Sequence, residues 1–378
     1  MKTTPYQARS YGPPPRRMRI LVLDEGHTMN CELFREAPEH DIIRLDCGPE
    51  ANADGTFRSR WREVNKRIRQ KQFDLAVVTD RKHCFWRSGR GITSGLVRMA
   101  KATLWEPQRM AHLQVPQELH RAGIPWALME RNDQCLIREG NHLLFHLATR
   151  VFVRELLQNR YEIFQAYREG QQDLRLWPKV WQMGPKVPIN LAKVFPISLG
   201  LKAGILSEPF RAEKKQHDIL WSGAIACRTP RMAAVDEVAE ASTQHGWKFF
   251  RPERLSLAEF QQECSRAWLC LSPSGNGWDC YRHYEILAAG SVPLINYPWI
   301  ERYAPLQDGT HCFLFAVERG HVTEVIRQAL AAKEKLGQMA KEGQEWVGQH
   351  HRHEALRNYV IHETLQAHSP SRFLPPAG

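Results

Sequence analysis

The chain of 378 residues is longer than a single hydrophobic core usually supports, so we expect two domains. Its hydrophobic content of 43% and charged content of 25% are ordinary for a globular protein. The net charge of +11 favours anionic partners, such as nucleotide-sugars, anionic lipid surfaces or nucleic acid.

Sequence signals for export, membrane insertion and zinc binding are missing. The first seventeen residues contain no apolar core of a signal peptide, and no run approaches the roughly 18 apolar residues that cross a bilayer. The nine cysteines are scattered without CxxC spacing, and no Cys/His group has the spacing of zinc ligands. We therefore expect a cytoplasmic protein with reduced thiols, no metal site and no cofactor.

The N-terminal half alternates apolar strands with helical segments. The expected strands lie at 18–23, 41–46, 74–79 and 124–129, with a helix at 60–71. This alternation predicts a parallel, doubly wound sheet that binds ligands outside the carboxyl ends of its strands. We place this domain at 18–200, after a flexible leader at 1–17. Periodicity leaves open whether 141–157 is helical or contains a strand at 151–153.

A second α/β domain is expected at 201–350, followed by a helix at 351–368 and a loose tail at 369–378. Its expected strands lie at 218–221, 247–250, 292–295 and 311–315, with one more ending at Leu271. A helix is expected at about 231–245, and helical composition continues over 320–366. Ser256 and Glu259 form a capping box that begins another helix.

The most informative stretch is the strand–loop–helix–strand unit from Leu269 to Pro298. Its loop contains Ser272, Pro273, Ser274, Gly275, Asn276 and Gly277. A helix follows from Asp279 to Ala289 and is stopped by Gly290. We expect such a glycine-rich loop to leave backbone N–H groups unpaired at a helix N-terminus, where the helix dipole favours an anion.

Two charged side chains near this loop suit a nucleotide. Arg282 and Glu285 are three residues apart, so both can line one side of the first helical turns. An arginine forks onto phosphate oxygens, and an ionised carboxylate can accept hydrogen bonds from two ribose hydroxyls. The alternative is a solvated helix face that carries an ordinary ion pair.

The run SPSGNGWDCYRHYEILAAGSVPLI at 272–295 resembles the donor-binding motif of GT-B glycosyltransferases, and within them the exostosin-like and spore-maturation-protein-like branch. The shared pattern is Ser-Pro-x-Gly, Asp-x-x-Arg-x-x-Glu, Ala-x-Gly and x-Pro-Leu-Ile. The resemblance implies an α/β fold of two Rossmann-like doubly wound domains that face a cleft, with the C-terminal helix crossing back to the N-terminal domain. It also implies metal-independent chemistry and a ribose contact from Glu285.

One position departs from the pattern of this family. Many retaining members carry a second glutamate eight residues before the ribose glutamate, and this sequence has Gly277 there. The resemblance therefore does not extend to the mechanism of those members.

A second phosphate contact is expected where the strand at 218–221 ends. Glycine after a strand and arginines at a helix start are a common setting for an anion, although arginines at a turn are also ordinary surface residues. The complete set of predicted donor-binding residues is Ser222, Gly223, Arg228, Arg231, Ser274, Gly275, Asn276, Gly277, Asp279, Tyr281, Arg282 and Glu285. No Asp-x-Asp pair occurs in the sequence, so the arginines and the loop backbone are expected to supply the positive field that a metal otherwise provides.

A general base is expected from the N-terminal domain. The candidates at the carboxyl ends of its strands are Glu25, His27, Asp80 and Asp133. His27 titrates nearest neutrality and is the first choice, with Asp133 second; the alternative for each candidate, favoured for any one of them taken alone, is a loop residue that caps a turn.

These patterns predict a glycosyltransferase that moves a sugar from a nucleoside-diphosphate donor to a hydroxyl of a glycan, protein, small molecule or nucleic acid. Two alternatives remain open: a nucleic-acid glycosyltransferase that uses the basic surface, and a non-catalytic protein that binds a nucleotide-sugar. The basic run RSRWREVNKRIRQK at 58–71 is either a solvated helix face or part of such a surface.

Overall fold

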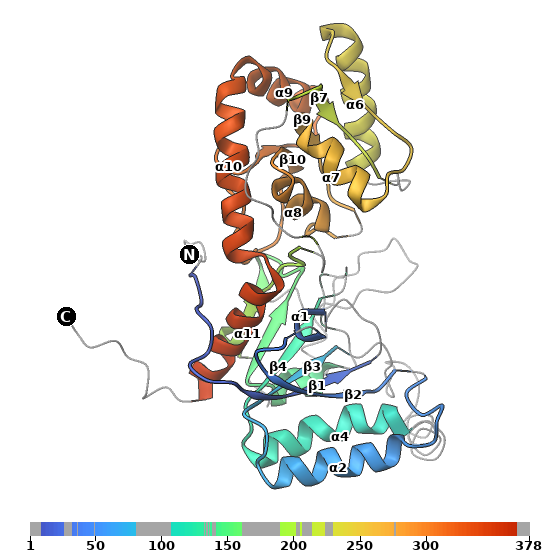
Figure 1. Ribbon diagram of the computed structural model, residues 1–378, viewed down its shortest axis with the longest axis vertical. Coiled ribbons are helices and arrows are strands. Elements are labelled where there is room, and N and C mark those ends of the chain that lie inside the picture. Colours follow the sequence, from blue (N-terminus) through green and yellow to red (C-terminus); the bar gives the residue numbers. More distant parts are fainter. Residues whose placement is uncertain are drawn as a thin grey trace, which may run out of the picture. The chain divides into compact units, whose positions relative to one another are not determined.

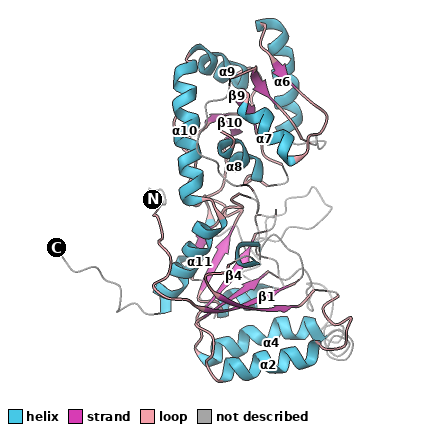
Figure 2. Cartoon of the chain, in the orientation of Figure 1, coloured by secondary structure: helices cyan, strands magenta, loops and turns pink. Residues whose placement is uncertain are grey.

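The computed structural model describes residues 9–25, 32–35, 37–48, 50–80, 107–131, 133, 135, 137, 141–160, 190–201, 205, 214–223, 230–275 and 277–368. The chain forms two compact units (Figures 1 and 2). The C-terminal unit comprises residues 198–355, and the N-terminal unit comprises residues 11–197 together with the chain from Leu356 onward. Both are α/β units with parallel sheets, as the alternation of strands and helices predicted.

The sheet of the N-terminal unit has six parallel strands in the order β2-β1-β3-β4-β5-β6. The strands are β1 Arg19–Asp24, β2 Asp41–Asp46, β3 Leu75–Thr79, β4 Trp126–Glu130, β5 Arg150–Val153 and β6 Val194–Pro196. Every residue of β3 and β4 is buried, because helices cover both faces of a parallel sheet. This is why these strands are continuous apolar runs in the sequence rather than alternating ones.

The helices of this unit are α1 Glu32–Arg35, α2 Phe57–Arg69, α4 Pro107–Ala122 and α5 His142–Leu147, with a short 3₁₀ turn at Leu191–Lys193. Helices α2 and α4 lie side by side against one face of the sheet (Figure 1). Helix α4 was not predicted from the sequence. It contains Pro116 in its interior and buries polar residues such as Gln108 and His112, so its sequence lacks a clean apolar stripe. The segment left open at 141–157 contains both a helix, α5, and a strand, β5.

The last helix, α11 His353–His368, belongs from Leu356 onward to the N-terminal unit. Its Tyr359 hydroxyl donates to the carbonyl of Pro196 at 3.0 Å, and the Arg357 guanidinium donates to the carbonyl of Leu33 at 2.6 Å. The segment before β1, expected as a leader, also contacts this helix: the Tyr11 hydroxyl donates to Glu363 at 2.6 Å. The chain thus crosses back to its N-terminal unit at the end, as the GT-B resemblance implied.

The sheet of the C-terminal unit has five parallel strands in the order β11-β10-β9-β7-β8. The strands are β7 His217–Leu220, β8 Phe249–Phe250, β9 Ala267–Leu271, β10 Val292–Asn296 and β11 Phe313–Phe315. The helices are α6 Pro230–His245, α7 Leu257–Ser265, α8 Tyr281–Ala288, α9 His321–Ala331 and α10 Lys333–His350. One apolar cluster joins β7 and β9 to α6 and α9, and another joins β9 to α7 and α8, so both faces of the sheet are covered.

Local sequence signals in this unit are confirmed. The Ser256–Glu259 capping box is formed in both directions at the start of α7. Gly290 follows α8 with φ +74°, a left-handed conformation that favours glycine.

Both sheets contain the same change of direction in strand order. In each sheet the second strand of the chain pairs on one side of the first strand, and the third strand pairs on the other side. The junction of β7 with β9 is therefore a topological switch point, as is the junction of β1 with β3. In open α/β sheets ligands bind beyond the carboxyl ends of the strands at this point.

No helix in the described part of the chain is long and apolar enough to cross a membrane.

Candidate functional site

The switch point of the C-terminal unit brings together two segments that are distant in the sequence. Strands β7 and β9 are in parallel register, with Leu220 opposite Cys270. Residues 221–223 beyond β7 and residues 272–275 beyond β9 therefore emerge at the same edge of the sheet. Both segments were predicted to contact phosphate, and the register explains how they meet.

Arg282, in the first turn of α8, lies against Gly223. A Cβ built on Gly223 would overlap the Arg282 guanidinium, and the φ of +151° at this residue also disfavours any side chain. The Arg282 guanidinium stacks over the Trp221 ring, 4.6 Å from its centroid. The guanidinium of Arg282 can therefore occupy this position only because residue 223 has no side chain.

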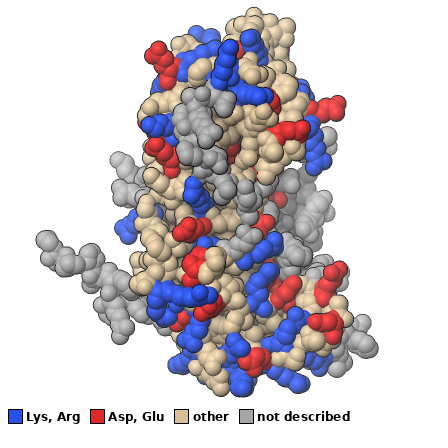
Figure 3. Space-filling view, in the orientation of Figure 1, with Lys and Arg blue, Asp and Glu red and all other residues tan. Residues whose placement is uncertain are grey.

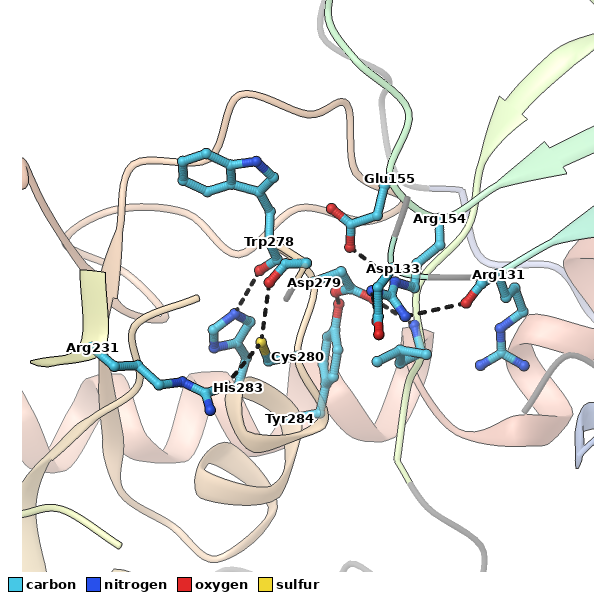
Figure 4. Close-up of polar contacts among 12 residues, drawn as sticks. Arg131, Asp133, Arg154, Glu155, Arg231, Trp278, Asp279, Cys280, His283 and Tyr284 are labelled. Atoms are coloured by element: carbon cyan, nitrogen blue, oxygen red, sulfur yellow. Dashed lines mark hydrogen bonds and ion pairs between the residues drawn. The ribbon is translucent and has the colours of Figure 1, made fainter. Parts of the chain in front are cut away.

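Arg231, in the first turn of α6, has the same relation to Gly275. A Cβ on Gly275 would overlap its guanidinium. Its Nε donates to the carbonyl of Pro273 at 3.4 Å, and its Nη2 lies 4.0 Å from the Cys280 sulfur (Figure 4). Two arginines therefore reach the glycine-bearing ends of two adjacent strands.

The electrostatics of this pair favour an anion. Burial, and next the neighbouring positive charge of Arg231, lowers the pKa of Arg282 to about 10. The Nη1 atom of Arg282 is buried and has no hydrogen-bond partner among the residues that the structure describes. Such a donor is costly unless a ligand or water pairs with it.

The loop at 272–278 differs from the sequence expectation in one respect. Several of its backbone N–H groups are used within the protein: that of Ser272 donates to Leu294 O at 2.8 Å, that of Ser274 to Asn296 Oδ1 at 2.7 Å, and that of Gly275 to Gly277 O at 3.1 Å. The expectation that the loop leaves its N–H groups unpaired is wrong for these three. Hydrogen bonds within the protein therefore hold the loop in place. The positive charge that an anion would meet here comes mainly from Arg231 and Arg282.

His283 is the central brace of this loop. Its Nδ1 lies 2.8 Å from the Ser272 hydroxyl and its Nε2 lies 3.0 Å from the carbonyl of Trp278 (Figure 4). Burial lowers the pKa of His283 to about 3. A neutral imidazole satisfies both contacts, because it donates to the Trp278 carbonyl from Nε2–H and accepts the Ser272 proton at Nδ1. His283 therefore ties the two ends of the loop to α8.

Asp279 supports the same region from the other side. It is buried; its Oδ2 accepts from the backbone N–H of Leu199 at 2.6 Å, and its Oδ1 accepts from the Tyr284 hydroxyl (Figure 4). Burial, and next the Asp279 carboxylate, raises the pKa of Tyr284. The contact with Leu199 links the start of α8 to the first residues of the C-terminal unit.

Other predicted donor-binding residues also lie in this region. Glu285 is buried, and its negative charge opposes the lowering of the Arg282 pKa. Ser222 is buried directly after Trp221, and Tyr281 packs against the apolar cluster that contains Leu199 and Leu287. His27, Arg228 and Asn276 lie outside the described residues.

Asp133 belongs to the N-terminal unit and is half exposed. Its Oδ1 accepts from Arg154 Nη2 at 2.6 Å (Figure 4). Arg154 is buried and also donates to Glu155 at 2.9 Å and to the carbonyl of Arg131 at 3.1 Å. A buried arginine thus holds one oxygen of Asp133.

Among the described residues, no group of three or more His, Cys, Asp or Glu side chains is arranged to hold a metal ion.

Three residues of this site were not predicted as functional: Trp221, His283 and Asn296. The Trp221 ring packs against the Arg282 guanidinium, and His283 binds the Ser272 hydroxyl in the loop. The Asn296 side chain accepts a hydrogen bond from the backbone N–H of Ser274. Asn296 could have been found, because an amide that ends an apolar parallel strand lies at the ligand edge of the sheet. Trp221 and His283 show no such signal, since aromatic residues at these positions are common in cores.

Comparison with known proteins supports the architecture. No protein-family model matches the chain, and no curated protein matches its sequence. Among solved structures, the Anabaena protein HepE in complex with UDP is similar with a TM-score of 0.50 at 12% identity, over 93% of this chain and 100% of that one. A glycosyltransferase from Rickettsia africae is similar with a TM-score of 0.53 at 7% identity, over 93% of this chain and 98% of that one. The chain therefore has the GT-B fold, as the sequence resemblance implied.

Proposed function

We propose that the C-terminal unit binds the diphosphate of a nucleoside-diphosphate sugar and that the protein transfers the sugar to a hydroxyl acceptor. The observation that carries this proposal is the pair of guanidiniums, Arg231 and Arg282, set against Gly275 and Gly223 at the switch point of a parallel sheet. The structure of HepE, which has the same fold, was solved in complex with UDP. The sequence motif adds the exostosin-like and spore-maturation-protein-like branch to this proposal.

The chemistry follows from where charge develops. As the bond between the sugar carbon and the diphosphate oxygen breaks, negative charge grows on the leaving diphosphate. Arg282 is protonated at neutral pH even with a pKa of about 10, so both arginines can stabilise that charge. Because they supply this field, we propose that transfer needs no divalent metal, and activity in excess chelator tests this part.

The acceptor hydroxyl loses its proton as its oxygen bonds to the sugar carbon. We keep His27 as the first candidate for the base that takes this proton and Asp133 as the second. Glu285, one turn after Arg282 on α8, is assigned to the ribose hydroxyls of the donor.

Titration calorimetry with UDP and GDP, and with the corresponding nucleotide-sugars, tests the donor site. We expect Arg282→Gln to weaken binding of the preferred nucleoside diphosphate by about 10- to 100-fold, because a hydrogen bond to a charged group contributes about 1.5–3 kcal/mol. Arg254→Gln is the matched control, since Arg254 is an exposed arginine between β8 and α7. Equal affinity of wild type and Arg282→Gln would refute the site. Release of UDP or GDP from the nucleotide-sugar by wild type separates an enzyme from a binding protein.

A further inference from the structure

A second basic feature lies in the N-terminal unit, on helix α2. Arg62, Asn65, Lys66, Arg69 and Gln70 line a hollow of about 350 Å³. Their spacing of three, four, seven and eight residues from the first places all five on one face of the helix. The opposite face of α2 carries Phe57, Val64 and Ile68, which are buried in the core. We call the five residues the α2 stripe.

Every side chain of the α2 stripe can donate hydrogen bonds, and none is acidic. In the described part of the chain, neither Arg62 nor Lys66 forms an ion pair. The neighbouring carboxylates are shared. Glu63 pairs with Arg67 at 2.9 Å and also interacts electrostatically with Lys66, and Glu118 of α4 pairs with Arg121 at 2.7 Å and with Arg69 at 3.7 Å. Arg69 and Arg121 share the single carboxylate of Glu118, so a net positive charge remains at that end of the stripe. The α2 stripe is therefore cationic along its length.

The partner that fits this chemistry is a regular row of phosphates. Arginine forks onto phosphate oxygens, and side-chain amides such as those of Asn65 and Gln70 also contact them. The nine residues from Arg62 to Gln70 span about 12 Å at 1.5 Å per residue. One strand of a nucleic-acid duplex advances about 3.4 Å along the duplex axis for each phosphate, so the α2 stripe covers an axial length of about three or four base pairs.

Two other polyanions fit less well. A membrane-docking helix exposes large apolar side chains beside its basic ones. Neither α2 nor α4 carries such a side chain among the described residues. The exposed large apolar residues of the described chain are Leu143, Met232, Leu257, Tyr297, Trp299 and Val317. A single strand needs aromatic side chains on which bases stack. Trp61, the aromatic residue within this part of α2, packs beside Phe57 with ring centroids 6.3 Å apart.

We propose that the α2 stripe binds the phosphate backbone of double-stranded nucleic acid without reading its sequence. The proposal does not rest on the donor site, which belongs to the other unit. Figure 3 shows Lys and Arg side chains on the surface where Figure 1 places α2, with acidic side chains among them. The overall net charge of +11 favours the same class of partner.

Fluorescence anisotropy with a labelled 20-base-pair duplex and the full chain tests this proposal. The test variant is Arg62→Gln/Lys66→Gln/Arg69→Gln. The control variant is Arg251→Gln/Arg254→Gln/Lys335→Gln, which removes the same charges from exposed positions of the C-terminal unit. At 50 mM salt we expect the test variant to bind at least about tenfold more weakly than wild type, with the control within about threefold of wild type.

The salt dependence gives a second readout. Each phosphate contact contributes about 0.9 to the slope of log affinity against log salt, so the test variant should lose a slope of about 2 to 3 and the control should lose less than 1. An unchanged melting temperature confirms that the test variant is folded.

Three results would overturn the proposal. Wild type that does not bind the duplex at 50 mM salt excludes it. Equal weakening in the test and control variants means that net charge alone is responsible. Stripe-dependent binding of phosphatidylserine vesicles by a protein that does not bind the duplex assigns α2 to a membrane surface instead.

Discussion

The two units share a topology and differ in the charge at its switch point. In the C-terminal unit Arg231 and Arg282 lie beside two glycines where the adjacent strands β7 and β9 end. In the N-terminal unit β1 ends in Asp24 and is followed by Glu25, and β3 is followed by Asp80; all three are buried carboxylates. Arg44 donates to Asp24 at 2.8 Å, so at least one of these is held in an ion pair. The fold places a topological switch point in both units, whereas the residues at the strand ends decide its chemistry.

This difference in charge bears on the proposed donor site. Two guanidiniums beside glycines at the end of a parallel sheet suit a diphosphate. Substitutions of Gly223, His283 and Asp279 test this description of the C-terminal switch point. They measure how much each residue contributes to ligand affinity or to stability.

The largest effect is expected from Gly223→Ala. The added Cβ overlaps the Arg282 guanidinium, and the φ of +151° strains any side chain. We expect affinity for the nucleoside diphosphate to fall about 100-fold or more, which corresponds to about 3 kcal/mol. Gly337→Ala is the control, since a Cβ at this α10 position meets nothing within 4 Å. Calorimetry that finds both variants equal to wild type would remove Gly223 from the site.

An intermediate effect is expected on acidification. His283 and His351 are buried with pKa values lowered by burial to about 3, against about 6.5 in the unfolded chain. The unfolded state therefore binds more protons below pH 6.5, and stability is lost as pH falls from there towards 3. At pH 5 each histidine should cost about 2 kcal/mol relative to neutral pH.

Urea unfolding at pH 7 and pH 5 measures this loss. We expect His283→Gln to be less stable than wild type at pH 7, because it disrupts the contacts to Ser272 and Trp278, and to lose about 2 kcal/mol less than wild type between the two pH values. An identical pH dependence of wild type and variant would show that His283 is not the neutral brace described above.

The smallest effect is expected from Asp279→Asn, which changes a carboxylate inside the cationic site. Because the carboxylate accepts from the backbone of Leu199 and from Tyr284, we expect stability to fall by about 1–2 kcal/mol. Donor affinity should change by less than about threefold. The opposite pattern, with weaker donor binding at unchanged stability, would make Asp279 a donor contact, as the sequence motif alone suggested.

Local features of the fold were predictable from sequence where neighbours in the chain decide them. The capping box at Ser256 is formed by residues three apart, and the stop at Gly290 needs a conformation that glycine adopts readily. Strands such as β3 and β10 are visible as apolar runs because helices bury both of their faces. Helix α4 was missed for the converse reason, since its buried polar residues and Pro116 hide the apolar periodicity.

The site was predictable in part. The glycine-rich loop and the Arg282–Glu285 spacing were visible in the sequence, but the engagement of the Ser274 and Gly275 amides was not. The partner of Ser274 is Asn296, at the end of the next strand, and the partner of Gly275 depends on how the loop turns.

The sequence by itself therefore determined the alternation of strands and helices, the GT-B class of fold and the segment that holds the candidate donor site. Only the tertiary structure decided that Arg231 reaches Gly275, that Arg282 reaches Gly223, and that His283 is a neutral brace. The physical reason is that hydrophobic periodicity depends on neighbours a few residues apart. Contacts across 44 or 59 positions exist only once parallel strands align their carboxyl ends.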